Sequence, residues 1–472
     1  MGSHDTMWVL TEQQVEFIHE ATVEVLESTG VLFHDEEARE ILGEAGARIC
    51  HNGIVRFPPS LVKDALALVP KQVTLRARDP NKDLVLNGKT AYYTNGFGAP
   101  RVLDLETGAI RPAISADVEQ FTRLADCLSN VDFCLIEVVP SDIPPETVDL
   151  ELAALVLTNT TKHVHVSTYN DRLIDAVIDL GMVISGSNSP AFSLGCCPLS
   201  PLVYPRDASQ RLIKAVRRGI PFFVVSGAIA GSSSPVTLAG TLVVQNAEVL
   251  AGIVLSQLVK PGAPVIYGTF ASPMDMRTGK QLLGSPELSL INAASAQLCR
   301  KYGIPFGYGT GGLTDAISPS FQAGVEKAMS VLFGTLAGSA VVHDAVSGLL
   351  AGATVASYEQ MVLDDELCNM VRRLSRGIEV EKETLATELI HQVGPGGTFL
   401  ASRHTVAHFR KELFISKLFR NHPYTSGAAG FAPEVSHARE AAKAILRKHE
   451  PLPLTRTQER EVEKILRRKW QE

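Results

Sequence analysis

The stretch Gly307-Tyr308-Gly309-Thr310-Gly311-Gly312-Leu313-Thr314-Asp315-Ala316-Ile317-Ser318-Pro319 joins an apolar segment to an amphipathic one. Residues 304–308 are typical of a strand, and a helical pattern begins near Pro319. Glycine at such a junction lets the backbone approach a ligand closely. Gly307, Gly309 and Gly312 also fit G-x-G-x-x-G, so a dinucleotide site is one interpretation. The surrounding fold has to decide what the stretch does.

Seven further apolar segments resemble the one at 304–308, and each is followed by a segment with helical periodicity. The predicted strands are 91–97, 131–139, 163–169, 191–197, 221–226, 264–270, 305–310 and 340–344. The predicted helices are 117–128, 147–158, 172–184, 208–218, 238–258, 286–301, 321–336 and 358–374. Short apolar strands alternating with longer helices indicate parallel strands joined by crossovers. Eight such units predict an α/β fold of the (β/α)₈ TIM-barrel type, with a doubly wound sheet as the alternative.

The predicted barrel spans 91–375 and has an extension at each end. Residues 1–90 are expected to form an N-terminal helical and β cap, which starts with a helix over 11–28 capped by Thr11 and Gln14. Residues 376–472 are expected to form a C-terminal helical extension that ends in a charged helix over 454–470.

The composition excludes some classes of partner. The net charge is −7, which argues against nucleic acid and anionic membrane, because both need a basic surface. The longest apolar runs, such as 247–259, are too short to span a bilayer and contain Glu248 and Gln257. The seven cysteines lack metal-binding spacing and fit reduced thiols in a cytoplasmic protein.

The predicted order of strands and helices argues against three familiar kinds of site: a dinucleotide site, a Schiff-base lysine and a metal centre. A Rossmann fingerprint belongs after the first strand, whereas this glycine-rich loop follows the seventh. A Schiff-base lysine belongs at a strand exit, but Lys162 is at a strand entrance. His163, His165, His343 and Asp344 could form a metal centre, although His163 opens its strand at the wrong end, and packing is favoured.

His404 and His408 are one helical turn apart, which is the spacing of zinc ligands. The general-base glutamate of H-E-x-x-H is missing, because Thr405 follows the first histidine. We therefore expect this helix to pack under or across the barrel.

The predicted strand exits are rich in aromatic residues and glycine and poor in acids and bases. The aromatic residues are Tyr92 or Tyr93, Phe97, Phe270, Phe306 and Tyr308. Ring faces attract a cation that cannot donate a hydrogen bond, so an aromatic cage suits a quaternary ammonium group. The alternative is that these rings are simply barrel core.

Several motifs, in order along the chain, resemble the trimethylamine:corrinoid methyltransferase family. They are residues 98–108, 267–279, 309–315 with Gln322 and Glu326-Lys327, 357–360, 394–397 and 404–412. The resemblance covers the chain from about residue 10 to its end. It implies a (β/α)₈ fold and methyl transfer to the cobalt of cobalamin or a related corrinoid on a cognate corrinoid protein.

One departure from the family pattern bears on the substrate. Trimethylamine enzymes carry pyrrolysine at the position that Ser318 occupies here. Members without pyrrolysine are similar to methyltransferases for glycine betaine and other quaternary amines. A quaternary donor needs no activation, because attack by Co(I) on its methyl group expels a neutral amine. No catalytic acid or base and no bound metal are then required, and catalysis would consist of orientation and desolvation.

The resemblance and the strand-exit positions together yield a set of expected site residues. Expected substrate-binding residues are Tyr93, Asn95, Phe97, Phe270, Arg277, Tyr308, Asp315, Ser318 and His343. Gly309, Gly311, Gly312 and His343 are expected to face the corrinoid. Arg101 and Arg206 are further candidates for a substrate carboxylate.

The sequence thus predicts a cytoplasmic quaternary amine:corrinoid methyltransferase, with glycine betaine as the first candidate donor. Carnitine, proline betaine and γ-butyrobetaine are close rivals. The alternatives are a metal-dependent TIM-barrel hydrolase and a non-catalytic betaine-binding homologue. A homo-oligomer is expected from the helical tail and from family habit.

Overall fold

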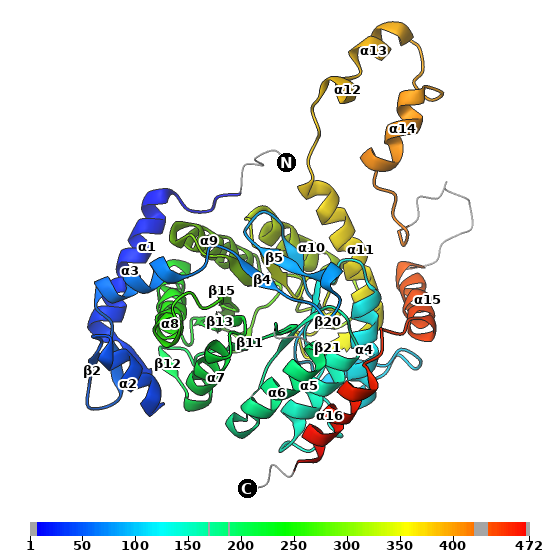
Figure 1. The fold of residues 1–472 in the computed structure, drawn as a ribbon. Helices are drawn as coiled ribbons and strands as arrows, with labels where there is room; N and C mark the ends of the chain where they lie inside the picture. Colours follow the sequence, from blue (N-terminus) through cyan, green and yellow to red (C-terminus); the bar gives the residue numbers. More distant parts are fainter. Residues whose placement is uncertain (1–6, 169, 187–188, 420–432, 469–472) are drawn as a thin grey trace.

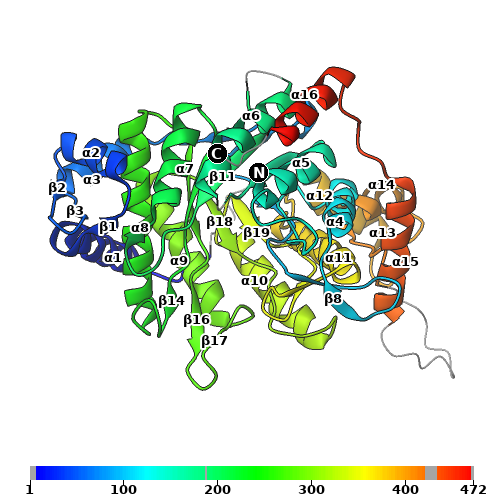
Figure 2. The same cartoon turned by 90° about the horizontal axis from the view of Figure 1, so that it is seen from below.

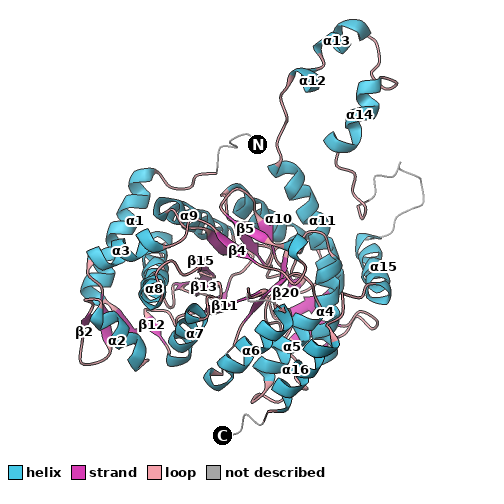
Figure 3. Cartoon of the chain, in the orientation of Figure 1, coloured by secondary structure: helices cyan, strands magenta, loops and turns pink. Residues whose placement is uncertain are grey.

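Eight parallel strands form the centre of the computed structural model, which describes residues 7–168, 170–186, 189–419 and 433–468 (Figures 1 and 3). The strand order is β6-β19-β18-β15-β13-β11-β10-β9. The two outermost strands approach each other through a parallel bridge between Thr94 and Phe133 and a 2.8 Å hydrogen bond from Asp132 N to Tyr93 O. The sheet is therefore a nearly closed barrel. Its strands are β6 (Tyr92–Tyr93), β9 (Phe133–Cys134), β10 (His163–Val166), β11 (Phe192–Cys196), β13 (Phe222–Ser226), β15 (Val265–Thr269), β18 (Phe306–Thr310) and β19 (Val341–His343).

A helix follows each strand and packs outside the barrel. These helices are α4 (Ser115–Cys127), α5 (Val148–Thr158), α6 (Ile174–Ser185), α7 (Arg206–Arg217), α8 (Leu238–Val259), α9 (Pro286–Tyr302), α10 (Phe321–Leu336) and α11 (Tyr358–Ser375). The short 3₁₀ turn η3 (Asp171–Leu173) precedes α6. The predicted (β/α)₈ barrel is confirmed, and each helix is close to its predicted range. Some strands are shorter than predicted: β6 and β9 have two residues each, within the predicted ranges 91–97 and 131–139.

Two small sheets lie at the carboxyl ends of the barrel strands. The periodicity of the sequence did not predict them. One has the order β20-β21-β7-β8 and another the order β14-β16-β17. Several of these strands gather along the lower edge of Figure 2. Their bounds are β7 (Arg101–Leu103), β8 (Ile110–Pro112), β14 (Ile229–Ala230), β16 (Ser272–Asp275), β17 (Lys280–Gln281), β20 (Leu349–Leu350) and β21 (Val355–Ser357).

A hairpin closes the opposite, amino-terminal end of the barrel. It consists of β4 (Val73–Leu75) and β5 (Leu84–Leu86), with the turn η2 (Pro80–Lys82) between them. Their apolar side chains share one buried cluster with Phe133, Phe223 and Val341 from the barrel strands. The amino-terminal half of the barrel interior is therefore a packed apolar core. A site is expected at the other end, where the strands have their carboxyl ends.

The N-terminal segment packs on the outer side of α8. It contains α1 (Glu12–Glu24), η1 (Val25–Thr29), β1 (Val31–Phe33), α2 (Glu36–Glu44), β2 (Arg48–Ile49), β3 (Ile54–Arg56) and α3 (Pro59–Leu68). The predicted capping box at Thr11 and Gln14 is present. β1 pairs with β12 (Val203–Tyr204), so this segment shares a sheet with a barrel loop.

The length of α8 corrects one inference from the sequence. This helix of 22 residues is long and apolar enough to cross a membrane by length and composition, although the uninterrupted apolar run looked too short. However, 72% of its most apolar window is buried inside the protein. The barrel strands cover one face of α8 and the N-terminal helices cover the other, so its apolar surface is core.

The C-terminal segment has two parts. α15 (Pro433–Lys448) packs against α11 and α4, and α16 (Arg456–Arg467) packs against α6. By contrast, α12 (Lys382–Leu385), α13 (Thr387–Val393) and α14 (Arg403–Glu412) extend away from the barrel (Figure 1). The expectation that the helix carrying His404 and His408 packs against the barrel is therefore wrong. The centroids of the two rings are 4.3 Å apart with their planes tilted by 34°, and both rings contact Glu383 of the same extension.

Candidate active site

The carboxyl-terminal end of the barrel interior is polar, in contrast to the apolar amino-terminal half. Alternate residues of a strand face the same side. Val341 belongs to the interior cluster, so His343 continues its side within β19. Glu137 follows the end of β9, where its carboxyl group contacts the loop after β6. Both residues lie at the carboxyl ends of the strands, where barrel enzymes place their chemistry.

Glu137 is held by the loop that follows the first barrel strand. Its Oε2 accepts hydrogen bonds from Asn95 Nδ2 at 2.9 Å and from Gly96 N at 2.7 Å. Its Oε1 is buried and has no hydrogen-bond partner among the described residues. Burial raises the pKa of the Glu137 carboxyl well above its ordinary value, and the nearby Asp344 carboxylate raises it further.

Asp344 is the second buried carboxylate of this site. Its backbone has φ +63°, which is rare for a residue other than glycine and redirects the chain as β19 ends. Its Oδ2 lies 2.5 Å from His343 Nδ1, and its backbone N–H donates to Thr94 Oγ1. Asp344 Oδ1, like Glu137 Oε1, is buried without a hydrogen-bond partner in the described structure. Two neighbouring buried carboxyl groups thus each have one oxygen without a hydrogen-bond partner among the described residues.

A histidine chain crosses the neighbouring strands β10 and β11. His163 Nδ1 lies 2.6 Å from the carbonyl oxygen of Arg76, so this nitrogen must carry the hydrogen. Ser193 then donates to His163 Nε2 and accepts from His165 Nδ1. Burial lowers the pKa of both imidazoles, that of His163 to about 4. Both rings are therefore neutral near pH 7.

This chain of hydrogen bonds bears on the metal-hydrolase alternative. Both ring nitrogens of His163 are already used, one as a donor and one as an acceptor. Within the described ranges, no three side chains of the ligating types are grouped so as to hold a metal ion. The geometry therefore gives the hydrolase interpretation no support.

The structure brings some of the predicted substrate-binding residues to this site. Phe97 and Phe270 both pack against the interior cluster and are partly exposed. Asn95 is present in a different role: its amide exchanges hydrogen bonds with the backbone of Leu135 and donates to Glu137. It positions the carboxyl group and has no polar atom left for a substrate.

Tyr93 and Arg277 were expected at the site, but the structure places them elsewhere. The Tyr93 hydroxyl lies 3.0 Å from Thr335 of α10, and the Arg372 guanidinium stacks on its ring, so it faces the outer helices. Arg277 pairs with Asp275 in the β16–β17 hairpin, and its side chain is 88% exposed. The sequence assigned both to strand exits but could not determine the direction of either side chain.

The remaining predicted positions surround the loop after β18. Asp315 accepts hydrogen bonds from the backbone of Leu283 and Gly284, so its carboxylate ties two loops together. Ser318 is exposed just before α10, and Arg101 and Arg206 are exposed as well. The side chains of Tyr308 and Phe306 lie outside what the structure describes.

The glycines of this loop serve packing, which differs from the open space expected for a corrinoid. A Cβ on Gly311 would lie 2.6 Å from Val342 Cγ1. Gly312 has φ +77°, and a Cβ there would lie 2.3 Å from the carbonyl oxygen of Asp344. Gly309 pairs with Val342 in the barrel sheet. Close approach of β18 to β19 is therefore what requires Gly311 and Gly312.

A buried network holds this loop in place. Lys327 Nζ donates to Gly312 O, Ser347 Oγ and Asp364 Oδ2, and its side chain is fully buried. Glu326 Oε2 accepts from Asp315 N at 2.9 Å and from the Thr314 hydroxyl. The Glu326-Lys327 motif is thus a clamp from α10 onto the loop after β18.

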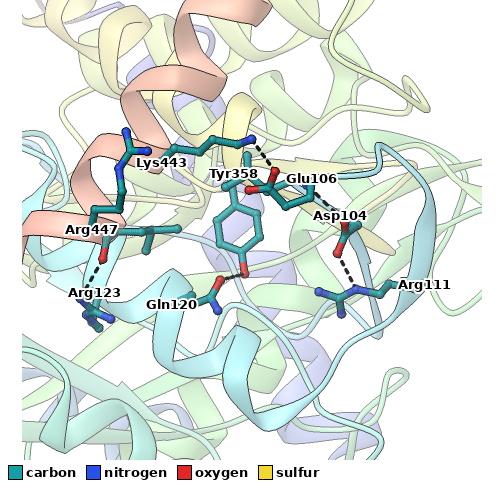
Figure 4. Close-up of a pocket in the computed structure, with 10 residues that line it drawn as sticks. Asp104, Glu106, Arg111, Gln120, Arg123, Tyr358, Lys443 and Arg447 are labelled. Atoms are coloured by element: carbon teal, nitrogen blue, oxygen red, sulfur yellow. Dashed lines mark hydrogen bonds and ion pairs between the residues drawn. The ribbon is translucent and has the colours of Figure 1, made fainter.

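A cavity of about 390 Å³ lies outside the barrel, between α4, α11 and α15 (Figure 4). Several of its charges are paired: Arg111 bridges Asp104 and Asp117, and Lys443 pairs with Glu106. These pairs attach α15 to the barrel, so we interpret this cavity as a structural interface.

Glu137 was not identified from the sequence, although it left a signal there. It is the only charged residue among the seven positions of 133–139, an otherwise apolar part of the predicted strand 131–139. A carboxylate in such an apolar segment needs a partner or a function if it is buried. Asp344 was noticed only as a metal-ligand candidate beside His343.

The fold and its site define a (β/α)₈ enzyme with a buried, carboxylate-bearing mouth, and the comparisons agree. The family model for trimethylamine methyltransferase (MTTB) matches residues 2–472. A trimethylamine methyltransferase MttB from Desulfitobacterium hafniense strain DSM 10664 / DCB-2 is 36% identical over 94% of this chain and 90% of its own length. A glycine betaine methyltransferase from D. hafniense strain Y51 is 34% identical over 89% of this chain and 88% of its own length.

The barrel also resembles a solved structure. The monomethylamine methyltransferase MtmB of Methanosarcina barkeri aligns with a TM-score of 0.51 at 14% identity, covering 92% of each chain. This likeness concerns the fold alone. The chain belongs to the trimethylamine methyltransferase (MTTB) family, and it is a methyltransferase.

Proposed function

We propose that this chain is a quaternary amine:corrinoid protein Co-methyltransferase with glycine betaine as the first candidate donor. The observation that carries the proposal is the pair of buried carboxyl groups, Glu137 and Asp344, each with an oxygen that no described group hydrogen-bonds. A buried carboxylate needs a compensating charge. A quaternary ammonium supplies charge without donating a hydrogen bond, and so matches oxygens that have no donor.

The remaining groups fit the two ends of a betaine. Phe97 and Phe270 lie at the same end of the barrel and offer ring faces to the methyl groups. His343 is buried at the end of β19, whereas Arg101, Arg206 and Arg277 are exposed, which supports His343 as the residue that meets the substrate carboxylate. The substrate carboxylate would therefore face His343, with the imidazole oriented by Asp344 Oδ2.

The side chains of the candidate site fit a reaction that needs no catalytic acid or base. A Co(I) corrinoid on a partner protein supplies the nucleophile that accepts the methyl group. Within this chain, neutral His163 and His165 are bound to Ser193, and Asn95 and Gly96 fix the Glu137 carboxyl. These residues would orient the cation and keep water out, which accelerates methyl transfer through position and desolvation. A cytoplasmic location, suggested by seven free cysteines, belongs to the same proposal.

Methyl transfer is tested by mixing the protein, a cognate corrinoid protein in the Co(I) state and a panel of methylated amines. We expect the methylated corrinoid, followed by absorbance, to form with glycine betaine or a related betaine. Transfer from trimethylamine alone, or from none of the amines, would overturn the proposal.

The role of the carboxyl pair is tested by binding. Glycine betaine is compared with 3,3-dimethylbutanoate, which has the same shape but carries carbon in place of the charged nitrogen. We expect the wild type to prefer glycine betaine by about 10-fold or more, which corresponds to about 1.4 kcal/mol. Glu137→Gln and Asp344→Asn should each reduce this preference, while Asp275→Asn, on the exposed hairpin, should not. An unchanged preference in both site variants would remove the carboxyl pair from the site.

A further inference from the structure

The candidate active site contains an acceptor oxygen that the proposed substrate leaves without a hydrogen bond. Glu137 Oε1 is buried and has no hydrogen-bond partner among the described residues. A quaternary ammonium group has no N–H, so it compensates the charge of a carboxylate but cannot donate to this oxygen. A buried acceptor without a donor retains the desolvation cost of the missing hydrogen bond. A ligand that combines the same positive charge with one N–H would therefore suit this oxygen better than the substrate does.

The surroundings of Glu137 keep Oε1 as the oxygen without a donor. Asn95 Nδ2 and Gly96 N both donate to the other oxygen, Oε2, at 2.9 Å and 2.7 Å. A Cβ on Gly96 would lie 2.6 Å from Glu137 Oε1 and 2.6 Å from Leu349 Cδ1, so the carboxyl group fills space that a glycine leaves open. Carbon atoms therefore border Oε1 on this side, and a donor has to come from a bound molecule.

Asp344 also has a buried oxygen without a partner, but it belongs to the other end of the proposed substrate. Its Oδ2 lies 2.5 Å from Nδ1 of His343, the residue proposed to meet the substrate carboxylate. The ammonium end of the substrate is then left for Glu137. The described donors to Glu137 are a side-chain amide and a backbone N–H, which are both neutral. Its negative charge is therefore available to a cationic ligand.

Methyl transfer itself produces a ligand with the missing N–H. The C–N bond of glycine betaine breaks and its electron pair stays on nitrogen, while the methyl group goes to the partner's corrinoid, which is oxidised from Co(I) to methyl-Co(III). The product, N,N-dimethylglycine, is a basic amine that takes one proton from the solvent near pH 7. Its nitrogen then carries a hydrogen where the substrate carried a methyl group. A charge-assisted N–H···O hydrogen bond is about twice as strong as a neutral one.

We propose that Glu137 Oε1 accepts a hydrogen bond from the protonated amine product, so that the site binds a tertiary ammonium ion more tightly than the quaternary substrate. The inference rests on the proposed function, because it concerns the product of that reaction at the same site. Product that stays bound slows turnover as the tertiary amine accumulates. Apolar contacts alone would give the opposite order of affinity, since the product has one methyl group fewer to pack against Phe97 and Phe270.

Equilibrium binding of two matched ligand pairs to the full-length protein separates the hydrogen bond from the charge. One pair is glycine betaine and 3,3-dimethylbutanoate. The other is N,N-dimethylglycine and 3-methylbutanoate, in which carbon again replaces the charged nitrogen. We expect N,N-dimethylglycine to bind about 10-fold more tightly than glycine betaine, which corresponds to about 1.4 kcal/mol. The preference for the charged member should also be larger in the second pair than in the first.

Glu137→Gln tests whether Glu137 is the acceptor. In this variant the amide oxygen can still accept from Asn95 and Gly96, which puts the amide nitrogen in the place of Oε1, where it cannot accept. The preference for the charged member should then be equal in the two pairs, because only the product can donate. Asp275→Asn, on the exposed β16–β17 hairpin, is the control and should keep the wild-type order of affinities.

The order of affinities in the unaltered protein decides the inference without any variant. If glycine betaine binds as tightly as N,N-dimethylglycine or more tightly, the inference is wrong and the proposed substrate is unaffected. The inference is also wrong if Glu137→Gln keeps the wild-type order. Failure of the proposed function has a different signature: no methylated corrinoid forms from any betaine, and neither glycine betaine nor N,N-dimethylglycine binds.

Discussion

Glu137 is the residue whose behaviour departs most from its type, because burial and Asp344 both raise the pKa of its carboxyl. The folded protein therefore keeps this proton above pH 4.5, the ordinary value, while the unfolded chain loses it. Folding stability then falls as pH rises from 4.5 towards the folded pKa, by up to about 1.4 kcal/mol per pH unit.

Glu137→Gln removes this dependence and retains an oxygen for the Asn95 and Gly96 hydrogen bonds. We predict that the variant equals the wild type in stability near pH 4.5 and exceeds it increasingly at higher pH. Urea unfolding between pH 4.5 and 8 measures the difference. A constant difference over that range would mean that Glu137 is ionised in the folded protein.

Cation binding next to Glu137 should lower the pKa of its carboxyl and release its proton. We predict that glycine betaine binds more tightly as pH rises above 4.5, with net proton release. Calorimetry in two buffers of different ionisation enthalpy measures the released protons. Glu137→Gln should abolish the release, and a wild type that takes up protons on binding would contradict this placement of the ammonium group.

The types of residue near the strand ends predicted only some of the side chains that the structure brings to the candidate site. Phe97 and Phe270 are partly buried against the interior apolar cluster, and their contact with substrate stays a prediction. Tyr93 and Arg277 have equally suitable side chains but face the outer helices and the solvent. Bulges and loops near the end of a strand disturb the alternation of side chains between its two faces. The position of a residue in the sequence therefore does not show which way its side chain points.

At the scale of elements, the loop after β18 is shaped by its contacts with β19 and α10. Gly311→Ala should destabilise the protein by about 1–3 kcal/mol, because its Cβ would overlap Val342 Cγ1 at 2.6 Å. Gly324→Ala, in α10 with no atom within 4 Å of the new Cβ, should stabilise it by about 0.5–1 kcal/mol. Denaturant midpoints of the two variants should therefore move in opposite directions.

The buried Lys327 network also holds the loop after β18 in place. Lys327→Met leaves Asp364 buried without its cation and should cost about 3–5 kcal/mol. Adding Asp364→Asn should recover part of the loss. Lys464→Met, which breaks the exposed Lys464–Glu461 pair, serves as the control and should have little effect. Equal effects of the two lysine substitutions in chemical unfolding would show that the clamp contributes nothing beyond a surface pair.

At the scale of the whole molecule, the homo-oligomer expected from the helical tail predicts that thermal stability depends on protein concentration. Association of folded chains stabilises the folded state by mass action, so dilution should lower the melting temperature. Calorimetric scans over a 100-fold concentration range measure this shift. A melting temperature independent of concentration would contradict the expected assembly.

The three predicted segments have different outcomes at this scale. The cap over 1–90 shares a sheet with the barrel through β1 and β12, and α16 returns to pack on α6. The division at 90 and 375 into separate folding units stays a prediction. The helical pattern of the tail was correct for α15 and α16, but the pattern could not show that α14 leaves the barrel.

The sequence by itself determined the barrel, because the alternation of strand and helix periods is local and eight repeats allow few topologies. It also determined the family, through motifs that turn out largely to be structural, such as the Glu326-Lys327 clamp. Only the tertiary structure brought Glu137, which follows the second strand, near Asp344, which follows the eighth. Such a pair depends on closure of the barrel and on the turn at Asp344, which are long-range properties that no local pattern encodes.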